Sequence, residues 1–203
     1  MLNADAEFRS RKTEVDEYLV HLQAMEQGTQ VSVTLMNTMK SSALLMIYNI
    51  VESTMSNLLQ DLFDHLESSN TTFDTLNQSM RQVVLTSIKR GSPKSIVERM
   101  KLPMGFVLAC FEKTDAFSGN LDSKVIRETL RELGVAGAEK HREKALLTVK
   151  AERNSLAHGN TSFSDCGKKY TVNDLTDIQQ KTCVALEKVI QDLENFLTAK
   201  AYA

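Results

Sequence analysis

The sequence predicts an all-α fold, an antiparallel bundle of five to seven helices with little or no β-sheet. Apolar residues recur at helical spacing along most of the chain. Only two prolines interrupt it, and it contains no repeat or low-complexity tract. Its 203 residues, 42% of them hydrophobic, suffice for one ordinary hydrophobic core. We therefore expect a single domain over residues 1–203.

The N-terminal part of the chain should form three helices. The first should cover residues 5–26 and stop at Gly28. A long second helix should cover about residues 31–66, and a third about residues 73–89. The apolar positions of the first two helices are Phe8, Val15, Leu19, Leu22, Leu35, Met39, Leu45, Tyr48, Met55, Leu59 and Leu62.

The middle of the chain departs from the helical pattern. Residues 91–105 hold both prolines, Pro93 and Pro103, so we expect one short helix between turns there. Residues 106–111 form a short apolar run that suits either a helix or a strand.

The C-terminal part should contain three more helices. Asp122 should cap a helix that ends at Gly134. A second helix should cover about residues 139–158, followed by a loop or small hairpin over 161–170 that turns at Gly167. The last helix should cover about residues 173–197 and bury Leu175, Ile178, Leu186, Val189, Leu193 and Phe196.

The composition argues against secretion and against a membrane span. Three cysteines without a CxxC pair indicate reduced thiols, which favours a cytoplasmic location. Charged residues occupy the N-terminus where a signal peptide would be apolar. Residues 41–60 carry one charge, Glu52, but polar residues interrupt them too often for a bilayer. We expect a buried central helix there.

The charge is unevenly distributed along the chain. Residues 1–72 hold four basic and ten acidic side chains, a balance of −6, whereas residues 81–113 hold seven basic and two acidic, a balance of +5. A basic segment of this kind suits a phosphate backbone, although a solvated protein face is the commoner explanation.

Known metal and cofactor motifs are missing from the sequence. His21, His65 and His141 lack the spacing of metal ligands, and no HExxH, Walker or GxGxxG sequence occurs. We therefore expect neither a metal site nor a cofactor.

The segment Arg153-Asn-Ser-Leu-Ala-His158-Gly is the most informative motif. An imidazole can transfer a proton near neutral pH, and a guanidinium can bind a phosphate through paired donors. Five residues turn an ideal helix by about 140°, so Arg153 and His158 do not share one face. They converge if Arg153 reaches round, if the helix unwinds before Gly159, or if a second copy completes the site.

Each residue of the motif also has a plain structural interpretation. Arg153 interrupts an apolar stripe and needs a partner, for which Glu52 is the obvious candidate; a structural ion pair would satisfy both. In the structural interpretation, His158 is simply a cation that complements the dipole at a helix C-terminus. Asn154 either donates to a phosphate oxygen, orients His158, or is an exposed polar residue near a helix end.

The order Arg, polar residue, three residues, His at a helix end resembles the signature of the HEPN superfamily. Residues 45–54, then 119–122, and the motif through Tyr170 resemble one bacterial branch of that superfamily. The resemblance implies a helical fold and a dimer whose two motifs meet across the subunit interface. It also implies catalytic roles for Arg153, His158 and Asn154. Glu52, the candidate partner of Arg153, would support them.

The function that these residues favour is a metal-independent endoribonuclease, in which a 2′-hydroxyl attacks the adjacent phosphate. His158 would move the proton and Arg153 would stabilise the phosphoryl charge. The resemblance implies a toxin or antiphage defence component, with RNA as substrate and a cognate antitoxin or another defence protein as a further partner. The alternative is a non-catalytic HEPN dimer that binds nucleotide, RNA or a protein.

Overall fold

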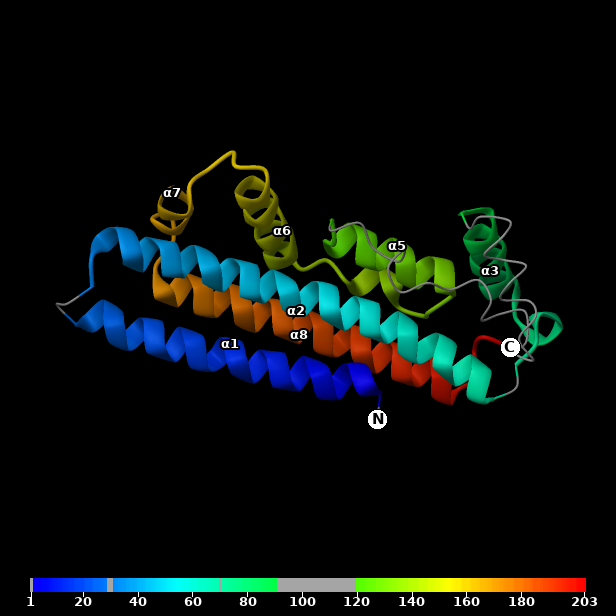
Figure 1. The fold of residues 1–203 in the computed structure, drawn as a ribbon. Helices are drawn as coiled ribbons and strands as arrows, with labels where there is room; N and C mark the ends of the chain where they lie inside the picture. The colour runs from blue at the N-terminus through cyan, green and yellow to red at the C-terminus, as the bar shows by residue number, and fades with distance from the viewer. Residues whose placement is uncertain (1, 29–30, 70, 91–119) are drawn as a thin grey trace.

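The computed structural model describes residues 2–28, 31–69, 71–90 and 120–203 (Figure 1). Within these ranges the chain forms seven α-helices and two 3-10 helices, and no β-strand. The all-α class predicted from the sequence is confirmed. The elements are α1 (Asn3–Gln27), α2 (Val33–Ser68), η1 (Phe73–Thr75), α3 (Gln78–Arg90), α5 (Ser123–Leu133), η4 (Ala138–Lys140), α6 (Lys144–Ala157), α7 (Phe163–Gly167) and α8 (Val172–Thr198).

Three long helices, α1, α2 and α8, lie side by side and form the base of the molecule (Figure 1). Helix α1 runs opposite to α2, as a short connection between neighbouring helices requires. Helix α8 runs in the same direction as α2, because α5, α6 and α7 carry the chain back toward the start of α2 (Figure 1). Helices α6 and α7 pack directly on α2. This returning layer holds the Arg153 motif above the middle of α2.

The hydrophobic core is one contiguous cluster that the three long helices share with the shorter ones. Its burial supplies the main favourable term for folding. The backbone N–H of Ala4 donates to the Asp61 carboxylate (2.8 Å), which ties the start of α1 to α2. The buried side chains include Phe8, Leu22, Leu44, Ile47, Met55, Leu58, Leu62, Leu175, Leu186, Val189, Leu193 and Phe196.

Helix α5 begins and ends where the sequence predicts. The Asp122 carboxylate accepts hydrogen bonds from the backbone N–H groups of Lys124 (2.8 Å) and Val125 (3.0 Å). Gly134 follows the helix in the left-handed conformation, with φ of 82°. Capping depends on residues close in sequence, so both boundaries are legible without the structure.

The prediction of one continuous helix over residues 139–158 is wrong in its first turn. Residues 138–140 form the separate 3-10 helix η4, which follows Gly137 in the left-handed conformation (φ 83°). Helix α6 begins only at Lys144, because the Glu143 side chain accepts a hydrogen bond from Ala145 N–H (3.0 Å) and caps it there. The third predicted helix likewise begins as η1, and α3 starts at Gln78.

The prediction of a loop or hairpin over residues 161–170 is also wrong. The segment contains α7, capped by the Ser162 hydroxyl, which accepts from Asp165 N–H (3.0 Å). Gly167 is not a turn residue. A Cβ atom at Gly167 would lie 1.8 Å from the carbonyl oxygen of Asn37. The glycine therefore allows α7 to touch the backbone of α2, a contact that no sequence pattern revealed.

Two predictions, for residues 91–105 and 106–111, lie outside the described residues. In the part of the chain that the structure does describe, none of the helices has the length and apolar character needed to cross a bilayer. Helix α2, which holds the weakly charged stretch around Glu52, is instead the central element of the core.

Candidate active site

Helix α6 keeps α-helical geometry up to His158. The backbone N–H of His158 donates to the carbonyl of Asn154 (3.0 Å), the regular bond between residues four apart. The hypothesis that the helix unwinds before Gly159 is therefore wrong. The offset of about 140° between Arg153 and His158 persists within one chain.

Gly159 closes α6 in a Schellman motif. It has a φ of 68°, and its N–H donates to the carbonyl of Leu156 (3.1 Å). The N–H of Asn160 donates to the carbonyl of Ser155 (2.9 Å), the second bond of that motif. This closure fixes the backbone on which His158 stands. The His158 side chain is exposed, and among the described residues it has no side-chain hydrogen bond or ion pair.

Arg153 packs against α2, and its side chain is half-buried. Its guanidinium carbon lies 5.1 Å from the centroid of the Tyr48 ring, over the ring face. Its Nη1 donates to the side-chain oxygen of Asn154 (3.0 Å). The ion pairs among the described residues do not include one between Arg153 and any carboxylate. A half-buried guanidinium held in this way retains donors for an anion.

Tyr48 is buried on α2, and its hydroxyl accepts a hydrogen bond from the backbone N–H of Leu121 (3.1 Å). Burial raises the pKa of Tyr48 to about 12. The bond from Leu121 and the charge of Arg153 oppose that rise, whereas the negative charge of Glu52 adds to it. Tyr48 therefore interacts electrostatically with both Glu52 and Arg153.

Glu52 does not form the direct ion pair with Arg153 that the sequence suggested. Within the described residues, Glu52 interacts with Tyr48, one turn earlier on α2, and Arg153 stacks on the same tyrosine. Spacing by four residues places Tyr48 and Glu52 on one face of α2. Arg153 and Glu52 thus share Tyr48 as a common neighbour. A water-bridged contact between Glu52 and Arg153 stays a prediction.

Asn154 does not orient the His158 ring in this chain. Its amide oxygen accepts from Arg153, and its amide nitrogen donates to the side-chain oxygen of Asn120 (2.8 Å). Its backbone carbonyl accepts the helical hydrogen bond from the His158 N–H. The side chain of Asn154 therefore belongs to the surroundings of Arg153.

Three consecutive residues hold α6 and α2 in place from one side. Asn120 accepts from Asn154, Leu121 donates to Tyr48, and Asp122 pairs with Lys150 (2.6 Å). Residues 120–122 belong to a segment that resembles the HEPN superfamily, and the sequence alone gives no physical reason for them. Their polar contacts to the motif helix and to Tyr48 supply one.

Glu152, next to Arg153, anchors the other side of α6. Its carboxylate accepts hydrogen bonds from Lys169 Nζ (3.0 Å), Tyr170 Oη (2.9 Å) and Cys166 Sγ (3.3 Å). Burial alone would raise the pKa of Glu152, but these hydrogen bonds hold it below the ordinary value. Sequence reasoning missed Glu152, since a glutamate on an amphipathic helix normally faces solvent. Its carboxylate is occupied by α7 and the segment after it, and is not a partner for Arg153.

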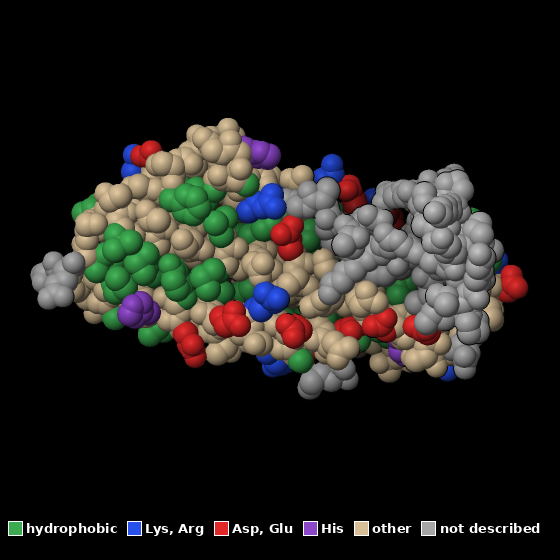
Figure 2. Space-filling model, viewed as in Figure 1, with side chains coloured by type: hydrophobic (Ala, Val, Ile, Leu, Met, Phe, Trp, Pro, Cys, Tyr) green, Lys and Arg blue, Asp and Glu red, His purple; other side chains and the backbone are tan. Residues whose placement is uncertain are grey.

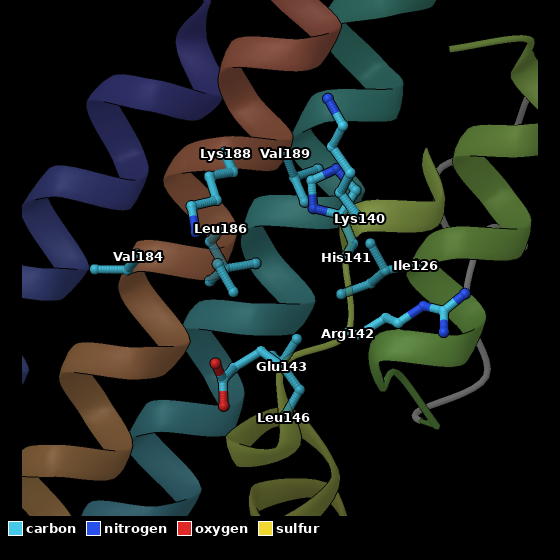
Figure 3. Close-up of a pocket in the computed structure, with 11 residues that line it drawn as sticks. Ile126, Lys140, His141, Arg142, Glu143, Leu146, Val184, Leu186, Lys188 and Val189 are labelled. Carbon is cyan, nitrogen blue, oxygen red and sulfur yellow. The ribbon is translucent and has the colours of Figure 1, made fainter. Parts of the chain in front are cut away.

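A pocket of about 210 Å³ lies at the opposite end of α6 from the motif (Figure 3). It is lined by η4, the start of α6 and the middle of α8, and includes His141 and Lys188. His141 is buried, and its Nε2 lies 2.9 Å from an Asp192 oxygen. None of the motif residues lines this pocket. The described residues contain no cluster of three or more His, Cys, Asp or Glu suited to a metal ion.

Comparison with known proteins identifies the family. The chain matches the family model described as HEPN_MAE_28990-like HEPN over residues 3–202. No curated protein and no solved structure matches it significantly. The family match covers nearly the whole chain, including the Arg153 motif and the helices that hold it. The chain therefore belongs to the HEPN superfamily, as a member of the HEPN_MAE_28990-like HEPN family.

Proposed function

We propose that this protein is a metal-independent endoribonuclease. The observation that carries the proposal is the state of Arg153, a half-buried guanidinium that stacks on Tyr48 and has no carboxylate partner among the described residues. A structural arginine in such a place normally pairs with a carboxylate. Arg153 instead keeps hydrogen-bond donors for a phosphate, beside an exposed histidine on a fixed helix end.

In the proposed reaction the RNA supplies its own nucleophile. His158 accepts the proton of a 2′-hydroxyl as its oxygen attacks the adjacent phosphorus. The bond from phosphorus to the 5′-oxygen breaks, and that oxygen takes up a proton. Arg153 stabilises the negative charge that builds on the phosphoryl oxygens. The products carry a 2′,3′-cyclic phosphate, or a 3′-phosphate after its hydrolysis, and a 5′-hydroxyl.

The active form in this proposal is a homodimer with a composite site. The offset between Arg153 and His158 supports it, because one helix directs the two side chains to different faces. Figure 2 shows hydrophobic side chains gathered over the N-terminal half of α2 and beside α7. The exposed large hydrophobic side chains include Val33, Leu35 and Phe163 from these two helices. An apolar surface next to the motif is suited to a second copy.

The biological setting is a further part of the proposal. A ribonuclease of this kind would act in the cytoplasm as a toxin or antiphage defence component. A cognate antitoxin or another defence protein would then restrain it. The family resemblance and the reduced cysteines, Cys166 and Cys183, support this setting.

The test is cleavage of a short RNA in EDTA by purified protein, beside His158→Ala. The wild type should cut the RNA, and a matched oligomer with 2′-methoxy groups should survive, because it lacks the internal nucleophile. Cleavage of the methoxy strand, or activity only with added Mg²⁺ or Mn²⁺, would contradict the mechanism.

The second candidate is a non-catalytic HEPN dimer that binds nucleotide, RNA or a protein partner. One observation favours it: among the described residues, nothing hydrogen-bonds to the His158 imidazole to orient it. Binding of the RNA at equal affinity by wild type and His158→Ala, without cleavage by either, would support this candidate.

A further inference from the structure

Arg153 can contact a phosphate at two points only if its guanidinium plane is held in one orientation. The described residues provide a single hydrogen bond to it, from Nη1 to Asn154. One bond leaves the plane free to rotate about that contact. Within the described part of the chain, Arg153 also contacts the face of Tyr48, with its guanidinium carbon 5.1 Å from the ring centroid. A planar cation over an aromatic face is attracted to it and tends to lie against it.

The Tyr48 ring is itself fixed at its far end. Its side chain is 2% exposed, so packing leaves it little rotational freedom. Its hydroxyl accepts a hydrogen bond from the Leu121 N–H (3.1 Å). The ring face that Arg153 contacts is therefore held by packing and by the hydrogen bond from Leu121.

We propose that Tyr48 is the positioning residue of this site. Its ring face, held in place mainly by burial and also by the hydrogen bond from Leu121, sets the plane of the Arg153 guanidinium for contact with the substrate phosphate. This inference rests on the proposed function for its substrate, an RNA phosphodiester, but the geometry it concerns is measurable without catalysis.

Two substitutions separate the ring from the hydroxyl. Tyr48→Phe keeps the aromatic face and loses the hydroxyl contacts, whereas Tyr48→Leu loses the face. Tyr202→Leu is the matched control, because Tyr202 is equally buried (2% exposed) and packs against His65 and Phe196, far from the motif. It reports what the loss of a buried tyrosine does to the fold alone.

The first measurement is the NMR signal of the Arg153 side-chain N–H groups in arginine-labelled protein. Ring current from Tyr48 should shift it upfield in the wild type, in Tyr48→Phe and in Tyr202→Leu, and the shift should vanish in Tyr48→Leu. An unshifted Arg153 signal in the wild type would overturn the proposal, whatever the protein does to RNA.

The second measurement is a double-mutant cycle on the Kd for an uncleavable 2′-methoxy RNA oligomer. Tyr48→Leu should weaken binding about tenfold in the wild-type background and leave it unchanged in the Arg153→Ala background. Tyr48→Phe should stay within about threefold of wild type. Equal weakening by Tyr48→Leu in both backgrounds would show a merely structural role and overturn the proposal.

The two hypotheses fail in different ways. In one outcome, the wild type fails to cut RNA while the ring-current shift and the coupled Kd values are found. The proposed ribonuclease activity is then wrong, but Tyr48 still positions Arg153 for contact with phosphate. If RNA is cut but the Kd effects are additive, the ribonuclease stands and the assignment of Tyr48 is wrong.

Discussion

Lys150 Nζ lies 2.6 Å from Oδ2 of Asp122, an ion pair that joins the middle of α6 to the residue that caps α5. Both side chains are mostly buried, with 23% and 12% of their surface exposed. The other oxygen of Asp122 accepts the N–H groups of Lys124 and Val125. One carboxylate therefore caps one helix and fastens it to the helix that carries Arg153.

Replacing Asp122 should separate these two roles. Asp122→Ala should lower the free energy of unfolding by about 3 kcal/mol, because it removes a cap and leaves Lys150 half-buried without its partner. Asp122→Asn should cost less, since asparagine also caps helices. Urea unfolding followed by circular dichroism measures both. Asp177→Ala, which removes an exposed pair with Lys181, is the control and should change nothing measurable. Equal losses for the Ala and Asn variants would mean that the cap contributes nothing.

The stability should fall in acid. Hydrogen bonds lower the pKa values of Asp122 and Glu152 below their ordinary 3.8 and 4.5, against the effect of burial. A carboxyl whose folded pKa is lowered stabilises the fold above its unfolded pKa, and this contribution is lost as the pH falls through the folded value. The urea midpoint should therefore be level near neutrality and decline below about pH 4.5. Glu152→Gln should have a smaller decline. A midpoint that is flat down to pH 3 would contradict this prediction.

Gly167 should tolerate no side chain. Gly167→Ala would place a Cβ against the Asn37 carbonyl and force α7 off α2, at a cost of about 2–3 kcal/mol in the free energy of unfolding. Gly159→Ala is the informative comparison, because no atom lies within 4 Å of its Cβ position and only the positive φ opposes it. Its cost should be about 1 kcal/mol. Chemical denaturation gives both values, and the reverse order would refute the close contact of α7 with α2.

Arg153→Lys should be severely impaired although it keeps the charge. An ammonium cannot make a planar two-point contact with phosphate, nor lie flat on the Tyr48 ring. We expect kcat to fall by about 100-fold, as for loss of one transition-state contact. Steady-state cleavage of RNA measures it, with circular dichroism to confirm the fold. Activity close to that of the wild type would show that charge alone suffices.

Mixed dimers should reveal whether the site is composite. Arg153→Ala and His158→Ala should each be inactive alone. If one copy supplies Arg153 and the other His158, a mixed dimer keeps one intact site out of two. After unfolding and refolding an equal mixture, about a quarter of wild-type activity should return, since half of the dimers are mixed. No recovery, with exchange of subunits verified, would place each site within one chain.

The sequence predicted those parts of the fold that depend on near neighbours. Asp122 and Gly134 mark the ends of α5 because a cap and a left-handed glycine act within one turn of the helix. Helix α7 could not be predicted in this way. Its five residues are too few for a periodic pattern, and it packs closely on α2 at Gly167, a contact with residues distant in sequence.

For the candidate site, too, the sequence predicted the residues of one local motif and missed a contact that depends on tertiary packing. The residues Arg153, Asn154 and His158 lie within one motif, and the sequence named them. Glu52 was expected beside Arg153, and the structure shows Arg153 stacked on Tyr48, with which Glu52 also interacts electrostatically. A tyrosine on an apolar helix normally belongs to the core, and Tyr48 is buried like its neighbours. Only the tertiary packing of α6 on α2 distinguishes it.

Residues 120–122 contact Asn154, Tyr48 and Lys150 through three successive residues. A slip of this extended segment by one position would move it about 3.3 Å and offer the wrong group to each of the three partners. An apolar leucine side chain would then meet Asn154, and the carboxylate would lose Lys150. Insertion or deletion of one residue between Asn120 and α5 should thus be more damaging than most substitutions there. The register of residues 120–122, which lie outside the motif, therefore contributes to the position of Arg153.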